Sequence, residues 1–511
     1  MLAKVCSGAV YGIDAYTVEI EVNSSRGDPQ TIIVGLPDIA VKESKDRVQT
    51  ALINSGFTMP KGRITINLAP ANIKKEGPSF DLPIAIGVLA TEGEIPRDNL
   101  PDFAMIGELA LSGEVRRVRG VLPIAAAMKA EGRKALLVPE VNADEAAVVS
   151  GINIYPVRSL RHAAELIAGT NKQKPYQVSI TDIFKMSSEY EEDFSDVKGQ
   201  EHAKRAIEVA VAGGHNILLI GPPGTGKTMI AKRIPSILPL MTLDEALETT
   251  RIHSIAGILD PHKALIVRRP FRAPHHTISD AGLLGGGTHP MPGEVSLADN
   301  GVLFLDELPE FHRNVLEVLR QPLEDGIVNI ARAVATVAFP CQIMLVAAMN
   351  PCPCGYFGDP NHECRCTPLQ IQHYRNRISG PLLDRIDIHI EVPAIRYQEL
   401  SSTGTGEPSA AIRERILAAR TIQQDRFKHL RKVHSNATMR PKDLQVFCPL
   451  HQENRDLLKM AISELHFSAR AYDRILKVSR TIADLEGSEE IQSHHISEAI
   501  QYRTLDRQFW I

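Results

Sequence analysis

A glycine-rich loop between a buried strand and a helix constrains this chain more than any other feature. Residues 221–228 match the pattern G-x-x-x-x-G-K-[ST] and directly follow the predicted buried strand 216–220. In that context the backbone N–H groups of the loop converge on phosphate oxygens, and the positive end of the following helix adds to the attraction. The pattern predicts a nucleotide-binding α/β domain, and a glycine turn without a ligand is the weaker alternative. The residues predicted to contact the nucleotide are Gly221, Pro222, Pro223, Gly224, Thr225, Gly226, Lys227 and Thr228.

Two side chains of this loop have distinct predicted roles. Lys227 is long enough to reach the β- and γ-phosphates, and the Thr228 hydroxyl can ligate magnesium. The expected cofactors are therefore ATP and Mg²⁺.

Two adjacent carboxylates close the next apolar strand, at 302–305. Ligands of parallel sheets bind at the carboxyl ends of strands, which is where these two residues lie. We expect Asp306 to hold the magnesium shell and Glu307 to polarise the attacking water. A solvated surface turn is the alternative, and the four apolar residues before the pair disfavour it.

A third apolar strand, predicted at 343–348, is followed by Asn350. We expect Asn350 to hydrogen-bond the γ-phosphate or the water, although an asparagine at a strand end is often only a turn former. Continuous apolar strands separated by helices indicate a parallel sheet with both faces covered.

The chain has 511 residues and is too long for one hydrophobic core, so we expect several domains. An α/β domain is predicted for 1–169, with an amphipathic helix at 46–55, followed by a polar linker at 170–195. The nucleotide-binding core is assigned to 196–400, a Ser/Thr/Gly linker to 401–408, and an almost wholly helical region to 409–511.

Four segments together resemble a known family. The phosphate loop and residues 193–200, 269–276 and 380–387 are similar to the magnesium-chelatase branch of AAA+ proteins. The chain from its first strand to Leu485 resembles the YifB/ComM family of magnesium chelatase-like ATPases. The resemblance implies an AAA+ P-loop core with a parallel sheet and a C-terminal helical lid.

The resemblance also implies roles for two arginines. Arg385 matches the arginine finger that reaches the γ-phosphate of a neighbouring subunit, and Arg470 matches the sensor-2 arginine of the lid. A finger acting between subunits requires a ring, so a homohexamer is implied. For each residue the alternative is a surface arginine in an ion pair.

The N-terminal domain resembles the Lon protease domain, an α/β fold of the S5 domain 2-like type, at 76–83 and 111–116. Ser79 falls on the nucleophile of that family, but Leu122 falls on its catalytic lysine, and leucine cannot accept a proton. We therefore expect a disabled peptidase, with Ser79 retained as the cap of a helix beginning at Asp81. A shift of the alignment would bring Lys129 into play instead.

Four cysteines crowd into one loop, spaced C-x-C, nine residues, C-x-C. Four thiolates on a short turn-rich loop suit tetrahedral zinc, although free thiols are the alternative. The predicted zinc ligands are Cys352, Cys354, Cys364 and Cys366.

Family resemblance implies a hexameric motor on single-stranded and branched DNA, a helicase that drives branch migration in homologous recombination and natural transformation, with recombination proteins as further partners. A net charge near +6 at 413–440 supports local phosphate binding in a chain of net charge −4. The alternative is a protein-remodelling ATPase of the magnesium-chelatase type, disfavoured because its motor subunit is expected to lack the N-terminal domain and the cysteine cluster. The candidate DNA contacts are Arg332, Lys74, Lys75, Arg116, Arg117 and Arg119.

The cysteine content outside the cluster does not suggest a disulfide scaffold, and the sequence contains neither a signal-peptide pattern nor an apolar run long enough to span a membrane. A cytoplasmic location without membrane attachment is therefore expected.

Overall fold

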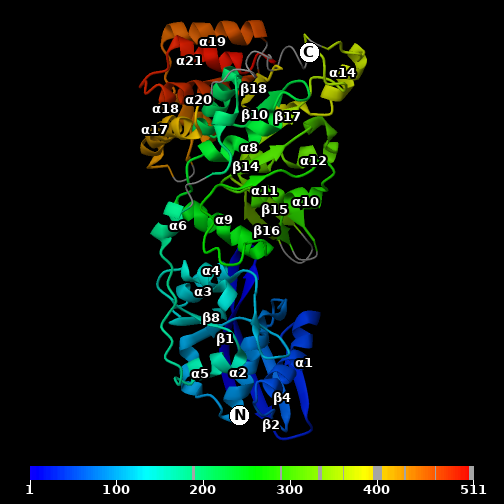
Figure 1. Ribbon diagram of the computed structural model, residues 1–511, viewed down its shortest axis with the longest axis vertical. Helices are drawn as coiled ribbons and strands as arrows, with labels where there is room; N and C mark the ends of the chain where they lie inside the picture. The colour runs from blue at the N-terminus through cyan, green and yellow to red at the C-terminus, as the bar shows by residue number, and fades with distance from the viewer. Residues whose placement is uncertain are drawn as a thin grey trace. The chain divides into compact units, whose positions relative to one another are not determined.

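The computed structural model describes the chain except at residues 187–189, 288–289, 332–335, 361, 395–405, 431–432, 466–467 and 506–511 (Figure 1). The chain divides into two compact units. The first contains Met1–Ser187, Thr242–Val267 and Ala331–Phe339, and the second contains Ser188–Met241, Arg268–Ile330 and Pro340–Ile511.

The first unit is built on a mixed seven-stranded sheet with the order β3-β4-β2-β1-β5-β8-β9. Its long central pair, β1 and β2, is antiparallel, whereas β5, β8 and β9 are parallel to β1. Val18, Ile20 and Val22 are completely buried, because β2 alternates apolar and polar residues with period two. The strands are β1 (Leu2–Tyr11), β2 (Asp14–Ser25), β3 (Gln30–Val34), β4 (Arg63–Ala69), β5 (Phe103–Met105), β8 (Ala135–Pro139) and β9 (Asn153–Val157), with β6 (Glu108–Leu109) and β7 (Val115–Arg116) forming a separate pair.

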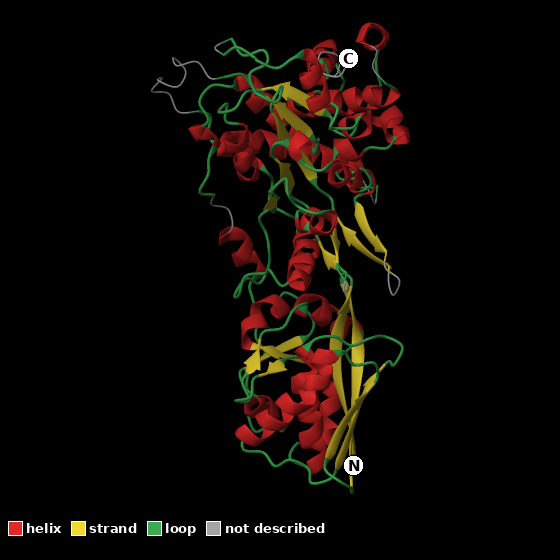
Figure 2. Cartoon of the chain, turned by 90° about the vertical axis from the view of Figure 1, so that its right-hand side faces the viewer, coloured by secondary structure: helices red, strands yellow, loops and turns green. Residues whose placement is uncertain are grey.

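Helices α2 and α3 pack against β1 and β2, beside the long strands seen in Figure 2. The predicted amphipathic helix is α1, which begins earlier than expected because Asp38 caps it by accepting a hydrogen bond from the Val41 N–H at 2.7 Å. The helices of this unit are α1 (Ile39–Asn54), α2 (Asp81–Glu92), α3 (Val121–Ala130), α4 (Ala143–Ala147), α5 (Leu160–Ile167), α6 (Ile180–Met186) and α9 (Leu243–Ala256).

Five parallel strands form the sheet of the second unit, in the order β11-β14-β17-β10-β18. All residues of β10, β14 and β17 are buried, which confirms the covered parallel sheet expected from continuous apolar runs. The strands are β10 (Ile217–Ile220), β11 (Phe271–Arg272), β14 (Val302–Leu305), β17 (Met344–Met349) and β18 (Ile388–Glu391).

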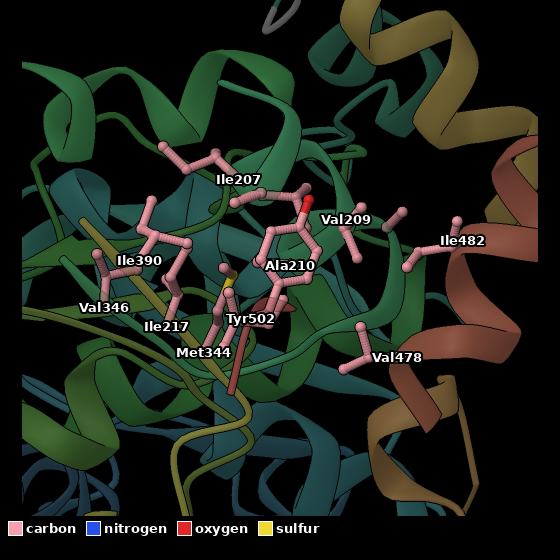
Figure 3. Packing of buried hydrophobic residues seen from close by; sticks show 14 of the residues in the cluster. Ile207, Val209, Ala210, Ile217, Met344, Val346, Ile390, Val478, Ile482 and Tyr502 are labelled. Carbon is pink, nitrogen blue, oxygen red and sulfur yellow. The ribbon is translucent and has the colours of Figure 1, made fainter. Parts of the chain in front are cut away.

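The C-terminal helices share one hydrophobic core with this sheet. Figure 3 shows Val478 and Ile482 of α20 beside Val209 of α7, with Tyr502 between them and the sheet residues. The helices of the second unit are α7 (Glu201–Gly213), α8 (Lys227–Ile237), α10 (Asp280–Leu284), α11 (Glu294–Leu297), α12 (Arg313–Val318), α13 (Pro322–Asp325), α14 (Pro368–Arg375), α15 (Gly380–Leu383), α17 (Ser409–Phe427), α18 (Pro441–Phe447), α19 (Gln452–Leu465), α20 (Ala469–Leu485) and α21 (Ser493–Gln501).

Two small hairpins interrupt the nucleotide-binding core. β12 (Gly285–Gly286) pairs with β13 (Met291–Pro292), and β15 (Ile327–Ala331) pairs with β16 (Thr336–Pro340). Arg332, the predicted DNA contact of the second hairpin, lies outside the described residues.

Two segments differ from the organisation expected from sequence. Residues 170–195 contain the helix α6, and the buried Phe194 at their end joins the core of the second unit. Thr242–Val267, expected in the nucleotide-binding core, folds with the N-terminal residues instead. Its helix α9 packs on α3, and the buried Ser254 hydroxyl donates a hydrogen bond to the Glu145 carboxylate.

Among the helices that the structure describes, none has both the length and the apolarity needed to cross a membrane.

Candidate nucleotide site and cysteine loop

The strand order of the second unit brings three predicted site segments to one edge of the sheet. β17 lies between β10 and β14, with Ile220 opposite Met349 and Leu305 opposite Ala347. The phosphate loop, Asn350 and the acidic pair follow these three strands, and the Gly221 N–H donates to the Met349 carbonyl at 3.2 Å. The parallel register therefore gathers segments that are far apart in the sequence.

Lys227 is 8% exposed and is held inside its own loop. Its ammonium group donates to the Gly221 carbonyl at 2.7 Å, the Pro222 carbonyl at 2.8 Å and the Asn350 Oδ1 at 3.2 Å. Gly226 caps α8 with φ +85°, a left-handed conformation that glycine adopts without strain. The lysine is thus placed at the helix N-terminus, where phosphate is bound in loops of this type.

Thr228 and Asp306 meet through a hydrogen bond of 2.6 Å, in which the threonine hydroxyl donates to Asp306 Oδ2. The other Asp306 oxygen accepts from the Glu307 N–H at 2.9 Å. A hydroxyl and a carboxylate are the oxygen ligands that magnesium takes beside phosphates, so the two residues fit the predicted metal shell.

Glu307 leaves the strand in a left-handed conformation, with φ +51°, and its side chain is exposed. Its Oε2 lies 3.3 Å from Nδ1 of His276, whose ring also meets the edge of Phe311. Sequence reasoning did not assign a role to His276. The one available signal was its position in the family segment 269–276.

Gln200 is a second residue that the sequence analysis did not single out. Its amide donates to the Thr225 carbonyl at 2.7 Å, which ties the segment before α7 to the phosphate loop. Gln200 closes the family segment 193–200, which was the only hint.

Burial lowers the pKa of Lys227 to about 8, and the Asp306 carboxylate partly opposes that shift. A bound phosphate favours the ammonium form, so the pKa in the complex must be higher than in the free protein. ATP affinity is then full below pH 8 and falls as the pH rises through 8, since binding must take up a proton. We expect the Kd for ATP to rise about fivefold between pH 8 and pH 9 in titrations with excess Mg²⁺. A flat profile would show that Lys227 remains charged in the free protein.

Arg385, the predicted arginine finger, is engaged within its own chain. Its side chain is 11% exposed, forms an ion pair with Glu324 and donates to the Arg320 carbonyl at 3.1 Å and the Pro381 carbonyl at 2.7 Å. Arg385 lowers the pKa of Glu324 through this bond, and the more distant charge of Arg470 adds to the effect. Arg470 itself is exposed in the first turn of α20.

The four predicted zinc ligands lie together. All four sulfur atoms are within 4.8 Å of one another, and Cys352 Sγ lies 3.4 Å from Cys354 and 3.7 Å from Cys364. Sulfur atoms bound tetrahedrally at about 2.3 Å from zinc lie about 3.8 Å apart, so the donor set fits that ion. His362, a histidine of the same loop that could also ligate a metal, contacts Asp359 at 3.3 Å.

The structure contradicts the prediction that Lys75, in the first unit, contacts DNA. Its side chain is completely buried, and its ammonium group donates to the Pro70 carbonyl and, at 2.8 Å, to the Ile73 carbonyl. A lysine that closes a turn from inside cannot meet a phosphate backbone. Its neighbour Lys74 is exposed and lies 3.5 Å from Glu76.

The three arginines near the end of β7 differ in exposure. Arg116 and Arg119 are exposed, and Arg116 lies 3.7 Å from Glu108. Arg117 is half-buried and donates to the Leu259 carbonyl. Arg116 and Arg119 are therefore the two accessible members among these three arginines.

Several arginines among the described residues of the basic stretch 413–440 are paired with carboxylates and are not free, in contrast to the expectation from its net charge. Arg415 forms ion pairs with Glu208 and Glu407, and Arg440 pairs with Asp443 at 2.8 Å. All three carboxylates lie outside the counted stretch, so much of its charge is neutralised within the fold.

A similar pairing removes Arg426 from the surface. Its guanidinium group bonds both oxygens of the fully buried Asp484, which lies 58 residues further along the chain.

Leu122 occupies the position that resembles the catalytic lysine of the Lon protease domain, and its side chain cannot accept a proton. Leu122 is buried, and its N–H donates at 2.9 Å to the Glu145 carboxyl, whose pKa burial raises. Lys129 is exposed at the other end of α3 and lies against Gly151.

The predicted capping role of Ser79 is wrong. α2 does begin at Asp81, but its N-cap is Phe80, and no side chain caps it. Ser79 lies in a 3-10 turn ahead of that cap, while the Asp81 carboxylate is bound by Arg47 at 2.8 Å.

Comparisons with known proteins match nearly the whole chain. Family models described as "Magnesium chelatase, subunit ChlI", "Subunit ChlI of Mg-chelatase" and "Magnesium chelatase, subunit ChlI C-terminal" match residues 193–400, 20–142 and 406–503. Because the N-terminal region is matched under the chelatase description too, its presence does not separate the two motor hypotheses, contrary to our expectation.

Two relatives match this chain over nearly the full length of both proteins. The chain is 47% identical over 511 residues to "Competence protein ComM" of Haemophilus influenzae, spanning 99% of this chain and 98% of that protein. It is 44% identical over 510 residues to "Uncharacterized protein YifB" of Escherichia coli, with the same coverage. A shorter match, 32% identical over 142 residues, links 27% of the chain to 25% of "Lon protease 2" of Bacillus subtilis. The chain therefore belongs to the YifB/ComM family of magnesium chelatase-like AAA+ proteins.

Proposed function

We propose that this protein hydrolyses ATP and uses the energy to move along DNA as a hexameric ring. The observation that carries the ATPase part is the meeting of the phosphate loop, Asp306–Glu307 and Asn350 at one edge of the sheet. Thr228 and Asp306 would hold Mg²⁺, which would supply positive charge beside the phosphates.

The residues of the site divide the work. Lys227 binds the β- and γ-phosphates, and Thr228 with Asp306 holds the magnesium shell. Glu307 orients and polarises the attacking water, while Asn350 donates from its amide to the water or to the γ-phosphate.

Arg385 completes the proposed site from a neighbouring subunit. Its guanidinium group carries a permanent charge, and its pairing with Glu324 would be exchanged for the γ-phosphate when subunits meet. Arg470 would contact the nucleotide from the lid. In this reading the isolated chain holds an incomplete site, and a homohexamer supplies the missing charge.

Support for DNA as the track comes from the near-full-length relative that is named a competence protein. We propose that the motor drives branch migration of recombining DNA, acts in the cytoplasm and contacts DNA through Arg332, Arg116 and Arg119, with Lys74 and Arg117 in supporting positions. A protein-remodelling motor of the chelatase type is the second candidate, favoured by the family models.

DNA should stimulate ATP turnover at low salt, and binding should weaken steeply as salt is added, because each neutralised phosphate releases counterions. Replacing Arg116 and Arg119 together with alanine should reduce the slope of log K against log salt by roughly 2. The measurement is ATPase rate and fluorescence anisotropy with single-stranded, duplex and branched DNA.

Lys134→Ala is the matched control, because Lys134 is an exposed cation of the same unit that also pairs with one carboxylate, Asp102, at 2.9 Å. Its salt slope should equal that of the wild type. If DNA at low salt changes neither binding nor turnover, the protein-remodelling function replaces the DNA motor.

The cysteine loop is proposed to hold one Zn²⁺ ion through its four thiolates. All four ligand positions would be filled by protein, so the ion would be structural and not catalytic.

A further inference from the structure

The four-cysteine loop begins at the nucleotide site itself. Asn350, which accepts a hydrogen bond from Lys227, is separated from Cys352 by one residue. Cys352 is fully buried, and its carbonyl accepts from the Gly355 N–H at 3.0 Å to form a tight turn. The chain thus passes directly from the predicted γ-phosphate contact into the first predicted metal ligand.

The same turn touches the phosphate loop. Gly355 is buried with φ +88°, and a Cβ atom at this position would lie 2.7 Å from Cδ of Pro223. The backbone at Gly355 therefore packs against the proline ring, leaving no room for a side chain. Pro223 adjoins Pro222, whose carbonyl binds the Lys227 ammonium group.

The other side of the turn is held by α14. Arg375 is 7% exposed and donates twice to the Pro351 carbonyl, at 3.2 Å from Nε and 3.1 Å from Nη2. Its guanidinium carbon lies 5.2 Å from the centre of the Phe357 ring. Arg375 thus holds residue 351 on one side, and the sulfur cluster begins at the next residue, Cys352.

Regular secondary structure does not hold this segment. Between β17 and α14, the described residues 350–360 and 362–367 form turns and bends with neither helix nor strand. A loop of this kind is ordered by its metal when its ligands are the four cysteines.

We propose that the metal-loaded cysteine loop is a positioning element of the nucleotide site: it seats Pro223 of the phosphate loop and fixes Asn350 beside Lys227. The proposal rests on the proposed ATP-binding function. Without the metal, the turn at 352–355 is no longer held in place. The contacts of Lys227 with the Pro222 carbonyl and with Asn350 then become less ordered. Displacing groups around a reacting phosphate by about 1 Å can cost on the order of 100-fold in rate.

The first experiment removes the metal without touching the turn. Cys364→Ser with Cys366→Ser replaces the two ligands most distant in sequence from Asn350. We expect zinc, near one per chain in the wild type, to be lost, and the Kd for a fluorescent ATP analogue to rise about tenfold with a lower kcat. Far-UV circular dichroism should remain that of the wild type, because the described residues of the loop form neither helix nor strand.

The second experiment leaves the cysteines intact and disturbs the contact between Gly355 and Pro223. Gly355→Ala should retain zinc but weaken ATP binding about tenfold, since the added methyl group must displace Pro223. Gly358→Ala is its matched control: Gly358 lies in the same loop at φ +83°, but a Cβ atom there meets nothing within 4 Å. The backbone strain of the two variants is alike, so a difference in ATP affinity reports on the contact with Pro223.

ATP affinity decides the outcome, and it is measured without DNA. Wild-type affinity in the zinc-free variant or in Gly355→Ala overturns the proposal, as does equal weakening in Gly355→Ala and Gly358→Ala. If the wild-type protein itself binds no ATP, the proposed function fails instead, so the two failures are distinct.

Discussion

Glu307→Gln will bind ATP as tightly as the wild type and hydrolyse it at least about 100-fold more slowly, the usual contribution of a general base. The amide keeps the size of the carboxylate but cannot polarise water by accepting its proton. Glu307 does not contact Lys227 or Thr228 through any bond that the described residues show, so ground-state phosphate binding is spared. Single-turnover hydrolysis and equilibrium binding measure the two effects separately.

Lys227→Ala provides the contrast, because it removes the contact to the ground-state phosphates. We expect it to lose nucleotide binding altogether. Normal turnover in Glu307→Gln would sink the assignment of Glu307, whereas tight ATP binding by Lys227→Ala would sink that of the phosphate loop.

Arg385→Ala will retain nucleotide binding and lose about 1,000-fold in turnover, at the lower end of what arginine fingers contribute. The reason is that the finger acts on charge that develops in the transition state, whereas the subunit's own phosphate loop binds the substrate. Steady-state ATPase at protein concentrations above the assembly threshold, with ATP present to promote assembly, is the measurement.

Mixing experiments separate a finger from a structural ion pair. Arg385→Ala subunits mixed with Lys227→Ala subunits should recover part of the activity, since some interfaces then combine an intact arginine with an intact phosphate loop. Glu324→Ala removes the carboxylate that pairs with Arg385 but leaves the arginine intact, so this variant should keep its turnover. A fully active monomer, or equal losses in both variants, would contradict the shared site.

The sequence predicted the nucleotide-binding sheet well because its strands are buried on both faces. Val302–Leu305 and Met344–Met349 read as continuous apolar runs, which have few alternative structures, and the phosphate-loop pattern predicts the turn and the helix α8 after β10. The same reasoning placed the acidic pair and Asn350 at strand ends. The parallel register of β10, β14 and β17 then brings these ends together at one edge of the sheet.

Surface charge could not be predicted in this way, because ion pairs join residues that are remote in sequence. Lys74 and Lys75 are adjacent and chemically identical, yet only the local turn decides that one is exposed and the other buried. The charge count over 413–440 included Arg426 without a partner, because its partner Asp484 belongs to a different helix. Net charge counts residues, and it carries no information on their partners.

The helix α9 shows a further limit. Its hydrophobic pattern marks a helix, but periodicity alone does not reveal which core receives the apolar face. The buried Ser254 and Glu145 form a bond across 109 residues of sequence that no local pattern encodes.

The position of α9 has a consequence for how such a protein can evolve. The chain passes from one unit to the other five times, at 187/188, 241/242, 267/268, 330/331 and 339/340. Recombination could therefore not exchange the gene segment for residues 1–169 by itself. The packing of α9 on α3 would be lost, because α9 is encoded elsewhere in the gene. A foreign N-terminal domain would have to arrive together with a matching α9, inserted more than 70 residues downstream within the ATPase. Descent of the two units as one block is the simplest history of such an interleaved chain.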